Sequence, residues 1–169
     1  MYTFGPLGRQ VKLILLDNRY FADEPGPEAD ILGESQWDFL RTELNSSTAH
    51  FTLIGSGTQM LALDQRFENW GNFPRSRSRL LEMIRESHKG GVILLSGDRH
   101  IHEISVVNDE SVRYPLIDFT ASGRPIPTAD SKLRTTVTVW DHSSMSQISP
   151  SSSLTGTRKI RRCRCRHVI

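Results

Sequence analysis

The 169-residue chain lacks several features that would assign it to a class of protein at once. It has no apolar run near the roughly 20 residues that cross a bilayer, so we expect no membrane-spanning helix. Its first residues lack the charged start and the apolar stretch of a signal peptide, which predicts a cytosolic protein for the sequence as written. Cysteine is absent before position 163, so disulfides are not expected to shape the core.

Charge is missing from residues 143–157, whereas residues 158–169 carry six cations and no acid. Removing these six from the 21 basic residues leaves 15 against 19 acidic ones, a net charge of −4. The segment 143–169 has no apolar period, and we predict that it is disordered. Nucleic-acid contact through its arginines is not favoured, because the segment lacks interleaved aromatic residues and the rest of the chain is acidic.

Both cysteines, Cys163 and Cys165, lie in this basic tail. Together with His167 they offer three zinc ligands, but a structural zinc site needs about four. Incidental cysteines in an unstructured end are the favoured interpretation.

The composition, 37% apolar and 24% charged, is typical of one soluble globular domain. The short apolar run at 11–16 predicts a strand covered on both faces, the run at 50–54 predicts a second strand, and the run at 92–95 predicts a third, buried one. Helical periods begin at Gly33 and Pro74, and a hairpin is expected over 103–120, with one more strand at 134–140. The alternation predicts an α/β fold.

Polar residues follow three of the predicted strands, at 17–19, 56–59 and 98–100. In α/β sheets, ligands bind beyond the carboxyl ends of the strands. We therefore expect these three segments to converge on one site.

Asp98 and His100 are separated by one residue after the strand at 92–95. In an extended chain, side chains at i and i+2 point the same way, so a carboxylate and an imidazole would face one site. Both groups are good metal ligands at neutral pH. The alternative is an ordinary Asp-x-His in a loop, which is common.

The sequence around Asp98 and His100 resembles a known family. The segment 94–103, Leu-Leu-Ser-Gly-Asp-Arg-His-Ile-His-Glu, is similar to the metal motif of PhoD-like alkaline phosphatases, a family of metallophosphatases. Four more blocks match that family in order: Leu15–Tyr20, Leu32–Trp37, Glu68–Pro74 and Thr120–Gly123. Five ordered blocks make a far more specific signal than one motif.

The resemblance implies a calcineurin-like metallophosphoesterase sandwich of mixed β-sheets flanked by helices. It also implies hydrolysis of phosphomonoesters or phosphodiesters at two or more divalent or trivalent metal ions, with Fe, Ca, Zn and Mn as candidates. Such metals polarise phosphoryl oxygens and generate a hydroxide nucleophile. Carried over to this chain, Asp98 and His100 are the metal ligands.

Other residues have two interpretations each. Arg19 would clamp phosphate oxygens or would pair with Asp17 or another acid. His102 would act as a base near the metals or would cover the end of its strand. Gln59 and Asn72 would face the site or serve turns.

One part of the family pattern, the segment that supplies most of the metal ligands, is missing from the chain. A two-metal site needs roughly six protein ligands, and the family takes most of them from a segment upstream of the Leu15–Tyr20 block. We therefore interpret residues 1–142 as the C-terminal part of the domain, with an uncovered sheet face and little or no phosphatase activity. A non-catalytic half-domain that binds phosphate-bearing partners or a complementary chain is the alternative. Family members are often exported or secreted, and a leader would then lie upstream.

Overall fold

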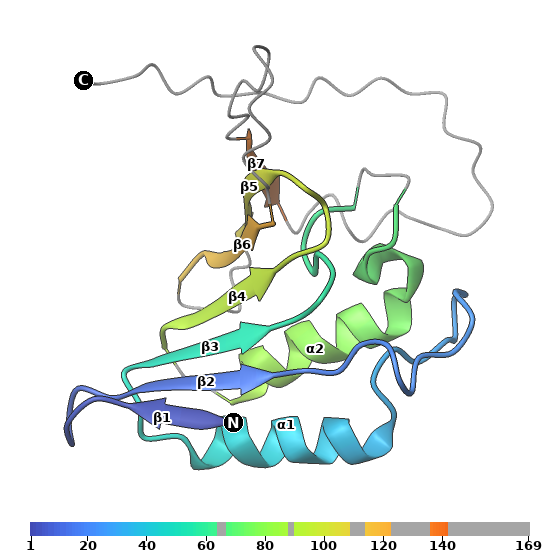
Figure 1. The fold of residues 1–169 in the computed structure, drawn as a ribbon. Coiled ribbons are helices and arrows are strands. Elements are labelled where there is room, and N and C mark those ends of the chain that lie inside the picture. Colours follow the sequence, from blue (N-terminus) through green and yellow to red (C-terminus); the bar gives the residue numbers. More distant parts are fainter. Residues whose placement is uncertain (64–66, 88–89, 109–113, 123–135, 142–169) are drawn as a thin grey trace, which may run out of the picture.

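The structure is a computed structural model that describes residues 1–63, 67–87, 90–108, 114–122 and, for the backbone, 136–141 (Figure 1). The predicted tail at 143–169, with its two cysteines, lies outside the described residues, as does most of the turn predicted after Val107.

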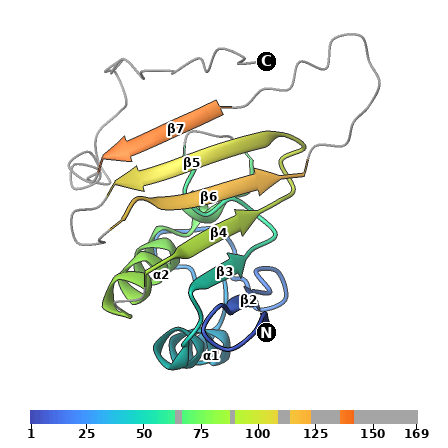
Figure 2. The ribbon, with the colours of Figure 1, turned by 90° about the vertical axis from the view of Figure 1, so that its left-hand side faces the viewer.

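In the described part of the chain, the strands form one mixed sheet in the order β1-β2-β3-β4-β6-β5-β7 (Figure 2). The strands are β1 (Tyr2–Phe4), β2 (Val11–Leu15), β3 (Phe51–Gly55), β4 (Val92–Ser96), β5 (His102–Asn108), β6 (Leu116–Ala121) and β7 (Thr136–Asp141). The neighbours β2, β3, β4 and β6 run parallel, so their carboxyl ends share one edge of the sheet. The α/β prediction is confirmed, and so is the antiparallel pairing of β5 with β6.

Two helices, α1 (Glu34–Ser46) and α2 (Pro74–Glu86), cover the same face of the sheet (Figures 1 and 2). The predicted stripe of α1 is confirmed, because Trp37, Leu40 and Leu44 are all buried. Pro74 is the first residue of α2, where its missing N–H has no helical partner to lose. None of the described helices is both long and apolar enough to span a membrane.

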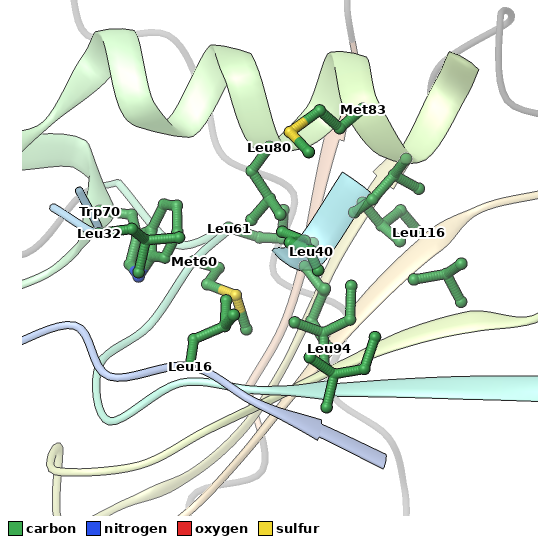
Figure 3. Packing of buried hydrophobic residues seen from close by; sticks show 14 of the residues in the cluster. Leu16, Leu32, Leu40, Met60, Leu61, Trp70, Leu80, Met83, Leu94 and Leu116 are labelled. Atoms are coloured by element: carbon green, nitrogen blue, oxygen red, sulfur yellow. The ribbon is translucent and has the colours of Figure 1, made fainter. Parts of the chain in front are cut away.

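The core lies between the two helices and the covered face of the sheet. Ile14, Ile54 and Leu94 project from successive parallel strands and are fully buried. Figure 3 shows Leu94 in one cluster with side chains that come from the helices and from the loop after β3, including Leu80 and Met60. This packing holds the ends of the parallel strands in fixed positions.

Asp30 fixes the start of α1. Gly33 occupies the N-cap position with φ 76° and has no side chain to cap the helix. The Asp30 carboxylate accepts hydrogen bonds from the backbone N–H groups of Leu32 and Gly33, and from Trp37 Nε1 at 2.8 Å. Burial would raise the pKa of Asp30, but these bonds, with one from Ser76, outweigh it and lower the pKa.

The opposite face of the sheet is not covered by the described residues. In β2, Ile14 is fully buried on the covered face, whereas its neighbour Leu15 is 58% exposed. The prediction that the strand at 11–16 is covered on both faces is therefore wrong for the described residues, because both helices lie on one side. A second sheet, as the resemblance implies, is not among the described residues.

Candidate active site at the carboxyl ends of the parallel strands

The segments after β2, β3 and β4 converge, as predicted. The buried side chain of Asn18 joins the first two: its Nδ2 donates to Thr58 Oγ1 at 2.9 Å, and its Oδ1 accepts from the Gly57 N–H at 2.9 Å. A Cβ on Gly97, after β4, would lie 3.4 Å from the Gly57 carbonyl oxygen. The three turns therefore lie close together, and the Asn18 amide joins the first two by hydrogen bonds.

Arg19 connects the turn after β2 to Asp98. Its Nη1 donates to Glu68 Oε1 at 2.7 Å, and its Nη2 lies 3.9 Å from Asp98 Oδ2. Arg19 thus pairs with an acid, Glu68, and its role as a phosphate clamp stays a prediction. The side chains of Arg19 and Asp98 are 59% and 56% exposed, so both can still reach a ligand.

Asp98 and His100 do not lie in an extended segment. Strand β4 ends at Ser96, and the backbone φ angles of Asp98 and His100 are 65° and 56°. The argument that i and i+2 side chains point the same way is therefore wrong here, because it applies only to extended chain. Non-glycine residues in this left-handed region are strained and gather at functional sites. The His100 N–H donates to Ser122 Oγ at 2.9 Å, which ties the turn to the end of β6.

The turn after β2 is held by Gln36 of α1. Gln36 Nε2 donates to the Asp17 carbonyl at 2.8 Å, and its Oε1 accepts from the Asp17 N–H at 2.9 Å. The Asp17 carboxylate in turn accepts from the N–H groups of Tyr20 and Arg19, which lowers the pKa of Asp17. These bonds bring the 15–20 and 32–37 blocks together in space.

A buried acid beneath the site was missed by sequence reasoning. Asp118 of β6 is 0% exposed, and its carboxylate accepts from Ser96 Oγ at 2.8 Å and from the N–H groups of Met60 and Leu61. Burial raises the pKa of Asp118, opposed by these three bonds. A single acid in the apolar run Leu116-Ile117-Asp118-Phe119 was the signal that could have found it.

Arg77 of α2 binds the same loop at residues 60–61. Arg77 Nε donates to the Met60 carbonyl at 3.0 Å. Burial lowers the pKa of Arg77 to about 10, although the charge of Asp118 opposes the shift. The peptide groups at 60–61 thus bind the buried carboxylate of Asp118 and the buried guanidinium of Arg77.

Gln59 serves the fold, whereas the role of the Asn72 side chain stays a prediction. Gln59 is fully buried, and its Nε2 donates to Glu103 Oε2 and Thr120 Oγ1. The interpretation that Gln59 faces the site is therefore wrong. The backbone of Asn72 accepts from the Gly26 N–H, as expected of a turn residue. His102 begins β5 opposite Ala121 on the uncovered face, and its role stays a prediction.

The described residues do not complete a metal site. Among them, no group of three His, Cys, Asp or Glu side chains is placed to hold an ion. Asp98 and His100 would need further ligands, and the metal role carried over to them stays a prediction.

The fold defines this protein as an α/β domain whose polar site lies at the carboxyl ends of its parallel strands. The family model described as PhoD-like phosphatase matches residues 1–129, and the chain belongs to this family. Alkaline phosphatase D from Bacillus subtilis (strain 168) is 24% identical over 123 residues, covering 59% of this chain and 21% of that protein. The solved structure titled "Structure of PhoD" matches with a TM-score of 0.62 and 20% identity, over 72% of this chain and 28% of that one. The structural match supports the fold, and this chain spans about a fifth of the curated relative's length.

Proposed function

We propose that this chain contributes Asp98 and His100 to a metal-dependent phosphoesterase site in a calcineurin-like fold. The substrates would be phosphomonoesters or phosphodiesters. The observation that carries the proposal is the approach of Arg19 Nη2 to Asp98 Oδ2 at 3.9 Å, at the point where three strand ends meet. An anionic metal ligand beside an anion-binding cation is the pairing that a phosphoester site needs. Family membership and the five ordered blocks support the same conclusion.

In this proposal Arg19 binds the phosphoryl oxygens. A guanidinium presents donors in a planar fork that matches phosphate. Glu68 holds Nη1 of Arg19, so the side chain is already oriented before a ligand arrives. His102, which is partly exposed at the start of β5, is proposed as the group that moves a proton.

We also propose that the 169-residue chain alone has little or no phosphatase activity. Two ligands bind a metal ion weakly, and the described residues supply no third one beside them. The remaining ligands would come from polypeptide outside the described residues.

The first experiment measures hydrolysis of a chromogenic phosphodiester by the purified chain with Mn²⁺, Zn²⁺, Ca²⁺ or Fe³⁺ added. We expect turnover at background, with weak metal binding by calorimetry that is lost in Asp98→Ala. Asp38→Ala is the matched control, because Asp38 is an exposed acid on α1 that pairs with Arg41. Turnover that disappears in Asp98→Ala would overturn the proposed inactivity, whereas metal binding unchanged in Asp98→Ala would overturn the ligand assignment.

The second candidate is a non-catalytic half-domain that binds phosphate-bearing partners or a complementary chain. The uncovered sheet face favours this candidate, because it leaves an apolar surface in need of cover. Binding of a phosphomonoester that depends on Arg19, without turnover at any metal concentration, would distinguish it from the enzyme.

A further inference from the structure

Phe67 is an exposed aromatic residue next to the candidate site. It directly precedes Glu68, which binds Arg19, and it is 62% exposed. Phe73, later in the same segment, is 3% exposed and belongs to the core. The core therefore takes up one phenylalanine of this segment and leaves the other in water.

A guanidinium covers part of the Phe67 ring. Arg99 Cζ lies 4.6 Å from the centroid of that ring. This is within the distance of about 6 Å at which a cation is attracted to the face of an aromatic ring. Much of Phe67 is exposed despite this contact, so a second planar group has access to the ring.

Among the described residues, Arg99 has no carboxylate partner. Arg19 differs, because its Nη1 donates to Glu68 Oε1 at 2.7 Å. The Arg99 Nε atom is buried and has no hydrogen-bond partner in the part of the chain that the structure describes. Stacking on Phe67, rather than an ion pair, therefore orients the Arg99 guanidinium.

Hydrogen bonds fix the backbone of both residues. The Phe67 carbonyl accepts from Asn69 Nδ2 at 2.7 Å, and Asn69 is 1% exposed. The Arg99 N–H donates to the Gly97 carbonyl at 2.8 Å. The ring and the guanidinium are thus in position before a ligand arrives, which lowers the entropic cost of binding.

The stacked pair lies beside Arg19. On one segment Phe67 and Glu68 are neighbours, and on the other Asp98 and Arg99 are. Glu68 is linked to Asp98 through Arg19, whose Nη2 lies 3.9 Å from Asp98 Oδ2. Phe67 contacts Arg99 directly. A ligand whose phosphate binds Arg19 would therefore bring its organic group to Phe67.

We propose that Phe67 and Arg99 form a stacking platform for an aromatic ring in the organic part of the phosphoester. The ring of the ligand stacks on the exposed part of Phe67, and the Arg99 guanidinium supports the Phe67 ring from the side that it covers. Such stacking accepts many flat rings, because each has a π face. The substrate class is therefore a phosphoester with an aryl or heteroaryl group rather than an alkyl one. This inference rests on the proposed function, in which Arg19 binds the phosphate.

The experiment is titration of the metal-free 169-residue chain with three phosphomonoesters, followed by the NMR shifts of its amide groups. Phenyl phosphate carries a flat ring, cyclohexyl phosphate carries a ring of similar size without a π face, and methyl phosphate has almost no organic group. We expect phenyl phosphate to bind about fivefold more tightly than cyclohexyl phosphate, because only the flat ring stacks. The shifts should be concentrated at residues 67–69 and 97–100.

Three variants test the platform. Phe67→Leu keeps an apolar side chain and removes the ring, so we expect phenyl and cyclohexyl phosphate to bind it equally. Arg99→Gln should reduce the preference for phenyl phosphate, because the Phe67 ring loses its cation. Phe4→Leu is the matched control: Phe4 is 55% exposed but pairs with Val11 at the amino end of β2, away from the site, so the preference should be unchanged. Circular dichroism reports whether each variant folds, and the comparison of the three ligands needs no variant.

Equal binding of phenyl and cyclohexyl phosphate would overturn the platform. So would a preference that Phe67→Leu or Arg99→Gln leaves unchanged, or one that Phe4→Leu also removes.

Arg19→Ala separates this inference from the proposed function. If Arg19→Ala weakens binding of all three esters and no preference for phenyl phosphate exists, the platform fails and the phosphate clamp stands. If the preference exists and Arg19→Ala changes no affinity, the platform stands and the clamp fails. Binding of none of the three esters would overturn both.

Discussion

Replacing Asp118 tests whether the loop beneath the candidate site depends on one buried carboxylate. Asp118 Oδ2 accepts from the Met60 N–H at 2.9 Å and from the Leu61 N–H at 3.2 Å, and Oδ1 accepts from Ser96 Oγ at 2.8 Å. In Asp118→Ala, Ser96 keeps a partner in Thr120 Oγ1 at 2.9 Å, but the two backbone donors lose theirs.

The magnitude follows from those two donors. Each buried N–H left without a partner costs about 1–3 kcal/mol, and Arg77 also loses an opposing charge. Part of this free-energy cost is offset in the variant, because burying the carboxylate itself is unfavourable. We expect Asp118→Ala to lower the free energy of unfolding by about 3 kcal/mol net, a large part of the stability of a small domain.

Asp118→Asn is the matched comparison. Its amide oxygen can take the place of Oδ2 and accept from both backbone donors, while its NH₂ group can donate to Ser96 Oγ. We expect a loss of at most about 1 kcal/mol. Urea unfolding with linear extrapolation measures both variants. Equal losses for the alanine and asparagine variants would refute the reasoning, since the backbone donors would then carry none of the effect.

The same pair gives a pH dependence. Burial raises the pKa of Asp118, so the folded state binds this proton more tightly than the unfolded state does. Stability contributed by the protonated carboxyl is therefore present below the ordinary pKa of about 4 and is lost as pH rises toward the raised value. The difference in unfolding free energy between the unmodified chain and Asp118→Asn should shrink as pH rises through that window. A difference that grows with pH would contradict the assigned shift.

Two further predictions concern the edges of the fold. Asp30→Ala should cost about 2–4 kcal/mol, because Trp37 Nε1 and two backbone donors lose a charged acceptor. Since the pKa of Asp30 is lowered in the folded state, its contribution should be lost as pH falls below about 4, which acid titration of unfolding can follow. Gly91→Ala should cost about 1–3 kcal/mol, because Gly91 has φ 72° and a Cβ there would lie 2.7 Å from the His50 carbonyl oxygen. Gly90→Ala is its control, with nothing within 4 Å of the added Cβ; similar melting temperatures for the two variants would contradict the strain argument.

Local patterns predicted most of the secondary structure. Apolar runs located β2, β3 and β4 to within a residue or two, and the stripe of Trp37, Leu40 and Leu44 located α1. The strand β1 was missed, because three residues are too few to show an alternation. The family could also be predicted from the sequence, because its matching blocks are short local motifs around turns and helix starts.

The candidate site was predicted only in outline. Strand order in a parallel sheet brings carboxyl ends to one edge, so the convergence of the turns that hold Asn18, Gly57 and Asp98 could be expected. The left-handed backbone of Asp98 and His100 could not, because it depends on how the turn meets Ser122 after β6. Gln59 looked like a site residue in the sequence, and distant partners in β5 and β6 bury it instead.

Residue order alone thus determined most of the strands and both described helices, because periodicity is a property of neighbours along the chain. The burial of Asp118, and the sheet face that the described residues leave uncovered, were decided by tertiary packing. Whether an acid finds buried donors, or an apolar strand finds a second cover, depends on residues far away in sequence. Both described helices pack on one side of the sheet, so the described residues leave the other side apolar and uncovered.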